Sequence, residues 1–415
     1  MEKYVISGGR RLNGVVKIES AKNSVLPILA ATVLTDEEVV IKDCPRIFDV
    51  LNMIKLLEHL GVKCKFQNEN LIVNASGFNG YSAPSSLTGV LRSSVFLLGP
   101  LIARAKKAKL CYPGGCDIGI RPIDMHLSAL STLGATVTEF GDEIICTAER
   151  IYGKDVYLDF PSVGATENVI LASATGLGET IIHNPAKEPE VFDLICCLNT
   201  MGANIRFKDN SHIVINGVKK LHGTYYKPIP DRIEAGTYLL ATAMCGGEVE
   251  IRGVNAENIS LILHKICDNT CITSIKDDII YVKSSGTRKN MSFETGPYPF
   301  FPTDLQAPAM ALATICSGTS VISENVFEMR FNHVADLIKM GADITVKGRT
   351  AIVNGVKNLH GACVKARDLR GGAALVLAGL SARGKTTVNE VFHIDRGYYK
   401  MDEKLRGLGA DIKRK

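Results

Sequence analysis

The chain has 415 residues, of which 46% are hydrophobic and 22% charged, and 48 Lys and Arg against 43 Asp and Glu give a formal net charge of +5. This composition excludes an intrinsically disordered chain, and the small positive excess, with no run of five basic residues, argues against a nucleic-acid or membrane-surface binder. No apolar stretch approaches the ~18 residues of a membrane span, and the first residues lack the pattern of a signal peptide. We therefore expect a cytoplasmic protein of two or three domains that binds neither nucleic acid nor membrane.

The first 75 residues predict six elements in a fixed order. Residues 15–18 are typical of a strand, 25–34 of an apolar helix, 39–41 of a second strand and 49–60 of an amphipathic helix, and 62–66 and 71–73 of two further strands. Gly61 follows the second helix and is expected to end it, because the left-handed conformation costs glycine least. The order of elements is therefore βαβαββ.

This pattern repeats along the chain. A glycine preceded by Leu or Met follows a helical segment at intervals of 73, 68, 139 and 68 residues, at Gly61, Gly134, Gly202, Gly341 and Gly409. The longest interval is two periods, with Thr270 near the absent glycine. Six βαβαββ repeats of about 70 residues predict a large α/β protein. Lys227-Pro228-Ile229-Pro230 predicts an extended linker after the third repeat, so we expect two similar lobes and a cleft between them.

The residues at the start of the first helix of each repeat suggest an anion site. Four of the six are basic, although a helix N-terminus disfavours cations unless an anion binds there. At spacings of 70, 70, 70, 72 and 66 these residues are Lys22, Arg92, Ser162, Arg232, Asp304 and Arg370. The alternative is a set of solvated surface charges, which equivalent placement in four repeats argues against.

The starts of three second helices add further cations, Arg121, Arg330 and Arg396. If the lobes face one another, these three would meet Lys22 and Arg370 in one cleft. Arginine forks match the paired oxygens of carboxylates and phosphates. The sequence therefore predicts a small, densely charged substrate.

Two residues are candidates for reactive groups. Among the 12 cysteines, no CxxC motif and no zinc-ligand spacing occurs. Most of them lie among apolar neighbours, as in Ile195-Cys196-Cys197-Leu198, where a free thiol acts as a small hydrophobic side chain. Cys116 differs, because it lies in a glycine-rich segment. The nearby Arg121 would favour the reactive thiolate, whereas the adjacent Asp117 would oppose it. Asp304 is a carboxylate where equivalent positions are mostly cationic, which makes it a candidate general base. Taken in isolation, however, this residue is better interpreted as a plain helix cap.

The chain resembles the UDP-N-acetylglucosamine enolpyruvyl transferases over essentially its whole length. The matching segments are SAKNS at 20–24, LRSS at 91–94, GGC at 114–116, RPID at 121–124, SVGATEN at 162–168, PDRIE at 230–234, FPTD at 301–304, EMRF at 328–331, DLR at 368–370 and HIDRGY at 393–398. The resemblance implies two inverse α/β barrel lobes, each of three repeats around a pseudo-threefold axis. The first lobe would comprise residues 22–228, and the second residues 1–21 and 229–415.

The implied activity is transfer of the enolpyruvyl group of phosphoenolpyruvate to the 3′-hydroxyl of UDP-N-acetylglucosamine, with release of phosphate. It proceeds by addition and elimination through a tetrahedral ketal, and it is the first committed step of peptidoglycan synthesis. The resemblance implies no metal or organic cofactor. We expect a monomer with these two substrates as its partners.

The resemblance also assigns roles to residues. Catalytic residues would be Cys116, as the acid that protonates phosphoenolpyruvate, Asp304, as the base for the sugar hydroxyl, and Lys22. Cys116 would also form a covalent adduct and be alkylated by fosfomycin. The phosphoenolpyruvate site would comprise Lys22, Asn23, Arg121, Arg330, Arg370 and Arg396, with Arg330 and Arg370 on the carboxylate. The UDP-N-acetylglucosamine site would comprise Asn23, Arg92, Arg121, Pro122, Ile123, Asp124, Met125, Ser162, Val163, Gly164, Asp304 and Val326.

Three residues depart from the family pattern, one of which is Thr270 in place of glycine, at a helix end distant from the motifs. Asp117 stands where the family usually has alanine, so we expect slower alkylation by fosfomycin than in an Asp117→Ala variant. Gly371 replaces a common alanine, which we expect to change only the packing. Two alternatives remain: the sister enzyme that makes 5-enolpyruvylshikimate 3-phosphate, which lacks the Gly-Gly-Cys segment, and a UDP-sugar-binding regulator without turnover, which would need neither Cys116 nor Asp304.

Overall fold

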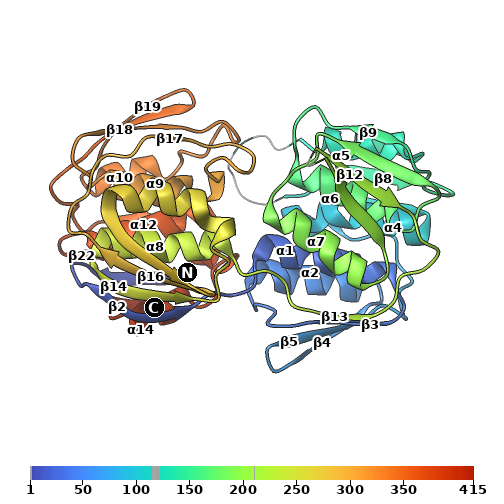
Figure 1. The fold of residues 1–415 in the computed structure, drawn as a ribbon, viewed down its shortest axis with the longest axis horizontal. Helices are drawn as coiled ribbons and strands as arrows, with labels where there is room; N and C mark the ends of the chain where they lie inside the picture. The colour runs from blue at the N-terminus through green and yellow to red at the C-terminus, as the bar shows by residue number, and fades with distance from the viewer. Residues whose placement is uncertain (1, 115–118, 120–121, 210) are drawn as a thin grey trace. The chain divides into compact units, whose positions relative to one another are not determined.

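The computed structural model describes residues 2–114, 119, 122–209 and 211–415. These residues form two compact units, each of mixed α/β structure with helices packed inside strands (Figure 1). The first unit comprises residues 20–114 and 122–229, and the second comprises residues 2–19, Gly119 and residues 230–415. None of the helices within these described ranges is both long and apolar enough to cross a bilayer.

The elements of the first unit are, in chain order, α1 (Lys22–Ala31), η1 (Thr32–Leu34), β3 (Glu38–Ile41), α2 (Phe48–His59), β4 (Lys63–Gln67), β5 (Asn70–Asn74), α3 (Ser85–Thr88), η2 (Arg92–Leu97), α4 (Leu98–Ala105), β6 (Lys107–Cys111), α5 (Asp124–Thr132), β7 (Thr136–Phe140), β8 (Glu143–Thr147), β9 (Asp155–Tyr157), α6 (Val163–Ser173), β10 (Glu179–His183), α7 (Pro189–Thr200), β11 (Asn204–Lys208), β12 (His212–Asn216) and β13 (Thr224–Tyr226).

Those of the second unit are β1 (Lys3–Ser7), β2 (Leu12–Lys17), α8 (Arg232–Cys245), β14 (Gly247–Arg252), η3 (Glu257–Ile259), α9 (Ser260–Thr270), β15 (Cys271–Lys276), β16 (Ile279–Ser284), β17 (Phe293–Glu294), η4 (Thr303–Leu305), α10 (Gln306–Ala313), β18 (Thr319–Ser323), α11 (Val334–Lys339), β19 (Asp343–Lys347), β20 (Thr350–Asn354), β21 (Cys363–Lys365), α12 (Leu369–Ser381), β22 (Lys385–Asn389), α13 (Phe392–Asp395), α14 (Met401–Gly407) and β23 (Asp411–Arg414).

The described strands form six sheets, three in each unit, in agreement with six repeats. The first unit holds β13-β3-β5-β4, β6-β8-β7 and β11-β12-β10-β9, and the second holds β15-β16-β14-β2, β17-β18-β20-β19 and β21-β22-β1-β23. In five of these sheets, one edge strand is parallel to its neighbour and the other pairs are antiparallel. In the sheet of β9, for example, β9 is parallel to β10. In the sheet of β6, a single bridge between Ser82 and Lys109 takes that place.

The first and fourth repeats exchange their first strands. Strand β2, which precedes α1 in the chain, pairs in parallel with β14 from Leu12↔Gly247 to Lys17↔Arg252. Strand β13, which precedes α8, pairs in parallel with β3. The predicted strand at 15–18 therefore exists, but it belongs to the sheet of the fourth repeat. This exchange explains why the second unit includes the N-terminal residues 2–19.

The predicted glycine stops are confirmed. All five glycines have positive φ, between 88° and 101°, where a side chain would be strained. In the fourth repeat, Thr270 is the last residue of α9 and β15 begins at the next residue, Cys271, so the chain turns without a glycine.

The core of each unit is built around helices that are buried on almost all sides. In the second unit α8, α10 and α12 pack against one another, and all residues of α10 are buried. In the first unit α6 packs against α1, α4 and α7, and only two of its residues are not fully buried. Of the ten described cysteines, five are buried and three are partly buried, but Cys196 and Cys363 are exposed, so the prediction of apolar surroundings is wrong at these two positions. Of the adjacent pair, Cys197 is buried, whereas Cys196 is exposed because it lies on the solvent side of α7.

Candidate active site

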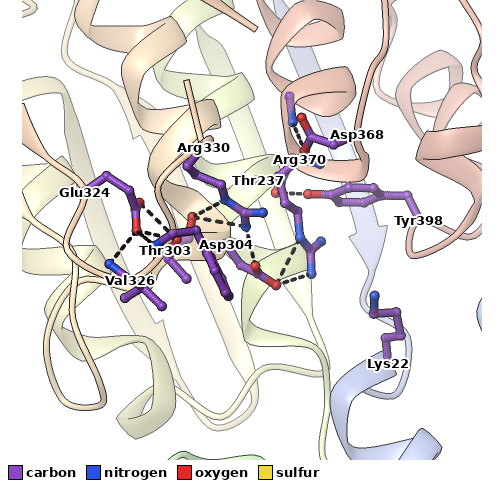
Figure 2. Close-up of polar contacts among 12 residues, drawn as sticks. Lys22, Thr237, Thr303, Asp304, Glu324, Val326, Arg330, Asp368, Arg370 and Tyr398 are labelled. Carbon is purple, nitrogen blue, oxygen red and sulfur yellow. Dashed lines mark hydrogen bonds and ion pairs between the residues drawn. The ribbon is translucent and has the colours of Figure 1, made fainter. Parts of the chain in front are cut away.

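The second unit brings three predicted site residues into direct contact. Arg370 donates to Oδ2 of Asp304 from Nη2 at 2.8 Å and from Nε at 3.2 Å. Arg330 donates from Nη2 to the other oxygen, Oδ1, and from Nε and Nη2 to the carbonyl oxygen of Thr303 at 3.4 Å (Figure 2). One carboxylate therefore lies between two guanidinium groups, which is a charge-assisted arrangement of high geometric specificity.

The start of α12 places Arg370. Asp368 caps this helix, because its Oδ1 accepts from the backbone N–H groups of Arg370 at 3.0 Å and Gly371 at 2.9 Å. A Cβ atom on Gly371 would lie 2.6 Å from Oδ2 of Asp368 and 3.1 Å from Cβ of His333. Gly371 is therefore in contact with the cap of the helix that carries Arg370.

The aromatic ring of Tyr398 supports Arg370 from another side. The guanidinium carbon of Arg370 lies 5.3 Å from the centre of that ring, and the Tyr398 hydroxyl is 2.8 Å from Oγ1 of Thr237 on α8. Burial alone would lower the pKa of Arg370, but Asp304 and Tyr398 outweigh it, so the pKa is raised above its ordinary value. Arg370 is therefore a permanent cation held in place by α8, α12 and Asp304.

Asp304 lies in the short helix η4, directly before α10. The preceding residue, Thr303, donates its hydroxyl to both oxygens of Glu324, at 3.0 and 2.9 Å. Glu324 also accepts from the backbone N–H of Val326, a predicted contact of the UDP-sugar, at 2.9 Å. The Glu324 carboxylate thus ties the segment of Asp304 to the segment of Val326.

Two predicted positions need correction. Arg330 and Arg396 do not begin helices: Arg330 lies in a turn that precedes α11, and Arg396 follows the last residue of α13. Both side chains are nevertheless buried, at 4% and 8% exposure. The second helices of the repeats are less regular than the first helices. In the fifth repeat the second helix, α11, is short, and in the sixth repeat the second helix is split into α13 and α14.

The predicted first-helix starts are confirmed in the other cases. Lys22, Arg92 and Arg232 are the first residues of α1, η2 and α8, and Ser162 caps α6 by accepting from the N–H of Ala165 at 3.4 Å. Arg232 is 8% exposed, and its guanidinium carbon lies 5.8 Å from the ring centre of Tyr298.

In the first unit, Lys22 forms an ion pair that the sequence did not reveal. Its Nζ lies 3.2 Å from Oδ2 of Asp49, which is buried in the first turn of α2. The partner fixes the ammonium group near the start of α1. Asn23 follows on the same helix and is half-buried.

Apart from Asn23 on α1, the described residues of the first unit that are predicted to bind the UDP-sugar lie around α5 and α6. Arg92 donates to the carbonyl oxygen of Pro122 at 3.4 Å, which joins η2 to the segment of Ile123, Asp124 and Met125 before and within α5. Val163 and Gly164 open α6. A Cβ atom on Gly164 would lie only 2.8 Å from Cε1 of His126, so a larger residue here would force the imidazole ring to move.

The amide of Asn168 holds His126 in that position. Asn168 Nδ2 lies 2.8 Å from Nδ1 of His126 and donates to the carbonyl oxygen of Val95 at 2.9 Å, while its Oδ1 accepts from the N–H of Gly99 at 3.0 Å. One buried amide therefore connects α4, α5, α6 and η2.

Cys116 and Arg121 lie outside the described residues. The contacts above unite Asp304 with Arg330 and Arg370, and Arg92 with Pro122. That Lys22 and the arginines of the second unit share one site stays a prediction.

Comparison with known proteins gives the class of the chain. Residues 6–405 match the sequence profile described as EPSP synthase (3-phosphoshikimate 1-carboxyvinyltransferase). The solved structure of the enolpyruvyl transferase NikO from Streptomyces tendae is similar with a TM-score of 0.91 at 26% identity, over 100% of this chain and 98% of that one. EPSP synthase from Acinetobacter baumannii shares the fold, with a TM-score of 0.78 at 18% identity over 100% of both chains. The chain belongs to the EPSP synthase family.

Within that family, the chain is similar over its full length to proteins of one name. UDP-N-acetylglucosamine 1-carboxyvinyltransferase 2 of Caldanaerobacter subterraneus subsp. tengcongensis is 47% identical over 415 residues, covering 100% of both chains. UDP-N-acetylglucosamine 1-carboxyvinyltransferase 1 of Clostridium perfringens is 46% identical over 420 residues, again covering 100% of both. The resemblance predicted from sequence motifs and the α/β class are thereby confirmed.

Proposed function

We propose that the protein transfers the enolpyruvyl group of phosphoenolpyruvate to the 3′-hydroxyl of UDP-N-acetylglucosamine and releases phosphate, in the first committed step of peptidoglycan synthesis. The observation that carries this proposal is the carboxylate of Asp304 between two buried arginines, in a chain whose full-length relatives are named for this activity. The arginines match a carboxylate substrate in shape and charge, and Asp304 supplies a base beside them.

The reaction requires an acid and a base on the two substrates. Cys116 gives a proton to the methylene carbon of phosphoenolpyruvate, and the sugar hydroxyl adds to the adjacent carbon while Asp304 takes its proton. The tetrahedral ketal then returns a proton from the methyl group to the Cys116 thiolate and expels phosphate, which restores the double bond. Lys22, Arg121 and Arg396 hold the phosphate, and their charges stabilise the leaving group.

Asp304 and the substrate carboxylate compete for the same donors. Arg330 and Arg370 bind the Asp304 carboxylate in the protein alone. When the carboxylate of phosphoenolpyruvate takes some of these donors, an oxygen of Asp304 becomes free to accept the proton of the sugar hydroxyl. The base is thus strengthened when the enolpyruvyl donor is bound.

We further propose that the protein acts as a cytoplasmic monomer without a metal or organic cofactor. The ten described cysteines are free thiols, as expected for a reducing compartment. Addition and elimination need only acids, bases and fixed charges, so turnover is expected to persist in excess EDTA. Sedimentation at micromolar protein tests the oligomeric state.

The decisive measurement is phosphate release from phosphoenolpyruvate with either UDP-N-acetylglucosamine or shikimate 3-phosphate as the acceptor. We expect release with the first acceptor only, and its loss in a Cys116→Ala variant. Release with shikimate 3-phosphate alone, or with neither acceptor, would overturn the proposed function.

A further inference from the structure

Glu324 is a buried carboxylate without an ion-pair partner in the part of the chain that the structure describes. Its exposed fraction is 0%, and it directly follows the last residue of β18. Its Oε1 accepts from the Thr303 hydroxyl at 3.0 Å and from the backbone N–H groups of Val326 and Phe327 at 2.9 and 3.1 Å, and its Oε2 accepts from the same hydroxyl at 2.9 Å. Burying a carboxylate is costly unless it is paired or hydrogen-bonded, so these hydrogen bonds are what keeps Glu324 inside the fold.

The bonds of Glu324 converge on the segment that carries Asp304. Thr303 connects three features: its hydroxyl binds Glu324, its carbonyl oxygen accepts from Arg330, and its backbone continues directly into Asp304 (Figure 2). Fixing the side chain of Thr303 therefore fixes the start of η4 and, through it, the direction of the Asp304 carboxylate. The two backbone bonds hold the turn of Val326 separately, so the Thr303 hydroxyl is the specific link to Asp304.

We propose that Glu324 is a positioning residue for Asp304 and that it acts through the hydroxyl of Thr303. This inference rests on the proposed function, in which Asp304 is the base. A base contributes to the rate only when its oxygen lies within hydrogen-bond distance of the proton that it removes. The Glu324–Thr303 bond provides that placement from a rigid strand end, while Arg330 and Arg370 hold the carboxylate from the other side.

The test is a series of substitutions at Thr303 in the full-length protein. Thr303→Val keeps the shape but removes the hydroxyl, and we expect kcat to fall by about 10- to 10²-fold, because small misplacements of catalytic groups have effects of this size. The KM values for both substrates should change far less. Thr303→Ser restores the hydroxyl and should recover most of kcat. The control is Thr386→Val, which removes a buried hydroxyl without a hydrogen-bond partner in the structure and should leave kcat unchanged.

Two further measurements separate positioning from a general structural effect. The acidic limb of the kcat–pH profile should move in Thr303→Val and not in Thr386→Val, because only the former alters the surroundings of the base. The effects of Glu324→Gln and Thr303→Val should be less than additive when combined, since both weaken one link.

Three results would overturn the inference: wild-type kcat in Thr303→Val, equal impairment of Thr303→Ser and Thr303→Val, or full additivity with Glu324→Gln. Absence of phosphate release by the wild-type protein is a different outcome. It would overturn the proposed function, and the role of Glu324 in catalysis with it.

Discussion

Arg370 places two of its nitrogens on one oxygen of Asp304, with Nη2 at 2.8 Å and Nε at 3.2 Å from Oδ2. The side chains of Arg370 and Arg330 are 2% and 4% exposed, whereas that of Asp304 is 26% exposed. The two cations are therefore fixed from the interior, and the carboxylate between them is the member of the cluster that reaches solvent. Asp304 balances the charge of two buried arginines in addition to its proposed role as a base.

Asp304→Asn should lower both activity and stability. Loss of a general base costs typically about 10²- to 10⁴-fold in rate. The free energy of unfolding should fall by about 1–3 kcal/mol, less than for a fully buried pair, because solvent reaches the carboxylate. Phosphate release and urea unfolding measure the two effects. Wild-type turnover in this variant would exclude Asp304 as the base, and an unchanged unfolding midpoint would exclude its role as the counter-charge.

Arg370→Lys should weaken the cluster although the charge is kept. An ammonium group can neither place two nitrogens on one oxygen in a planar arrangement nor stack on the Tyr398 ring as a guanidinium does. We expect kcat/KM for phosphoenolpyruvate to fall by about 10-fold or more, the value of a hydrogen bond to a charged group. Arg367→Lys is the matched control, since Arg367 is half-exposed and lies 3.7 Å from Asp336. Equal effects of the two substitutions would contradict a specific role for Arg370.

The repeats could be predicted from sequence because their signals are local. The glycine after Leu or Met ends a helix wherever it occurs, and five such positions have the positive φ that this requires. The pairing of β2 with β14 could not be predicted in the same way, because the two strands are more than 200 residues apart. An alternating strand has the same pattern in whichever sheet it lies, so only the completed fold determines its partner.

The site was predictable as a set of residues but not as a set of contacts. The periodicity placed Asp304 and Arg370 at equivalent helix starts, yet gave no indication that the two side chains meet. The partners Asp49 and Glu324 were missed because sequence shows a carboxylate without showing its burial. Glu324 comes just after a strand, where an acidic residue is usually solvated. Only the burial of its side chain in the folded protein distinguishes Glu324 from a solvated acidic residue.

Gly164→Ala should impair the proposed UDP-sugar site more than the phosphoenolpyruvate site. The added Cβ would lie 2.8 Å from Cε1 of His126. The imidazole ring cannot easily move away, because His126 is hydrogen-bonded to Asn168. Overpacking of this kind costs about 1–3 kcal/mol in stability. We expect KM for UDP-N-acetylglucosamine to rise more than KM for phosphoenolpyruvate. Gly407→Ala is the control, because a Cβ there has no neighbour within 4 Å. Equal KM values in the Gly164→Ala variant and the wild type would contradict the assignment.

His333 should make the stability of the protein depend on pH below neutrality. Its side chain is 2% exposed, and burial lowers its pKa from 6.5 to about 4, with Arg330 acting in the same direction and Asp368 against it. Between these two pH values the unfolded chain binds more protons than the folded protein, so the free energy of unfolding rises with pH. The contribution of the buried neutral His333 to the free energy of unfolding is fully present above pH 6.5. It is lost as pH falls toward 4, by at most about 1.4 kcal/mol per pH unit.

His333→Phe removes this titration and keeps a ring of similar size in the same buried position. The free energy of unfolding of the variant, measured by urea titration at intervals between pH 4 and 6.5, should therefore rise less steeply with pH than that of the wild type. His360→Phe is the matched control, because His360 is exposed and the substitution should leave the wild-type slope unchanged. Equal slopes in the wild type and the His333→Phe variant would show that the buried imidazole does not contribute to acid sensitivity. A slope that flattens only in the His333→Phe variant assigns this contribution to the residue packed beside the helix start of Arg370.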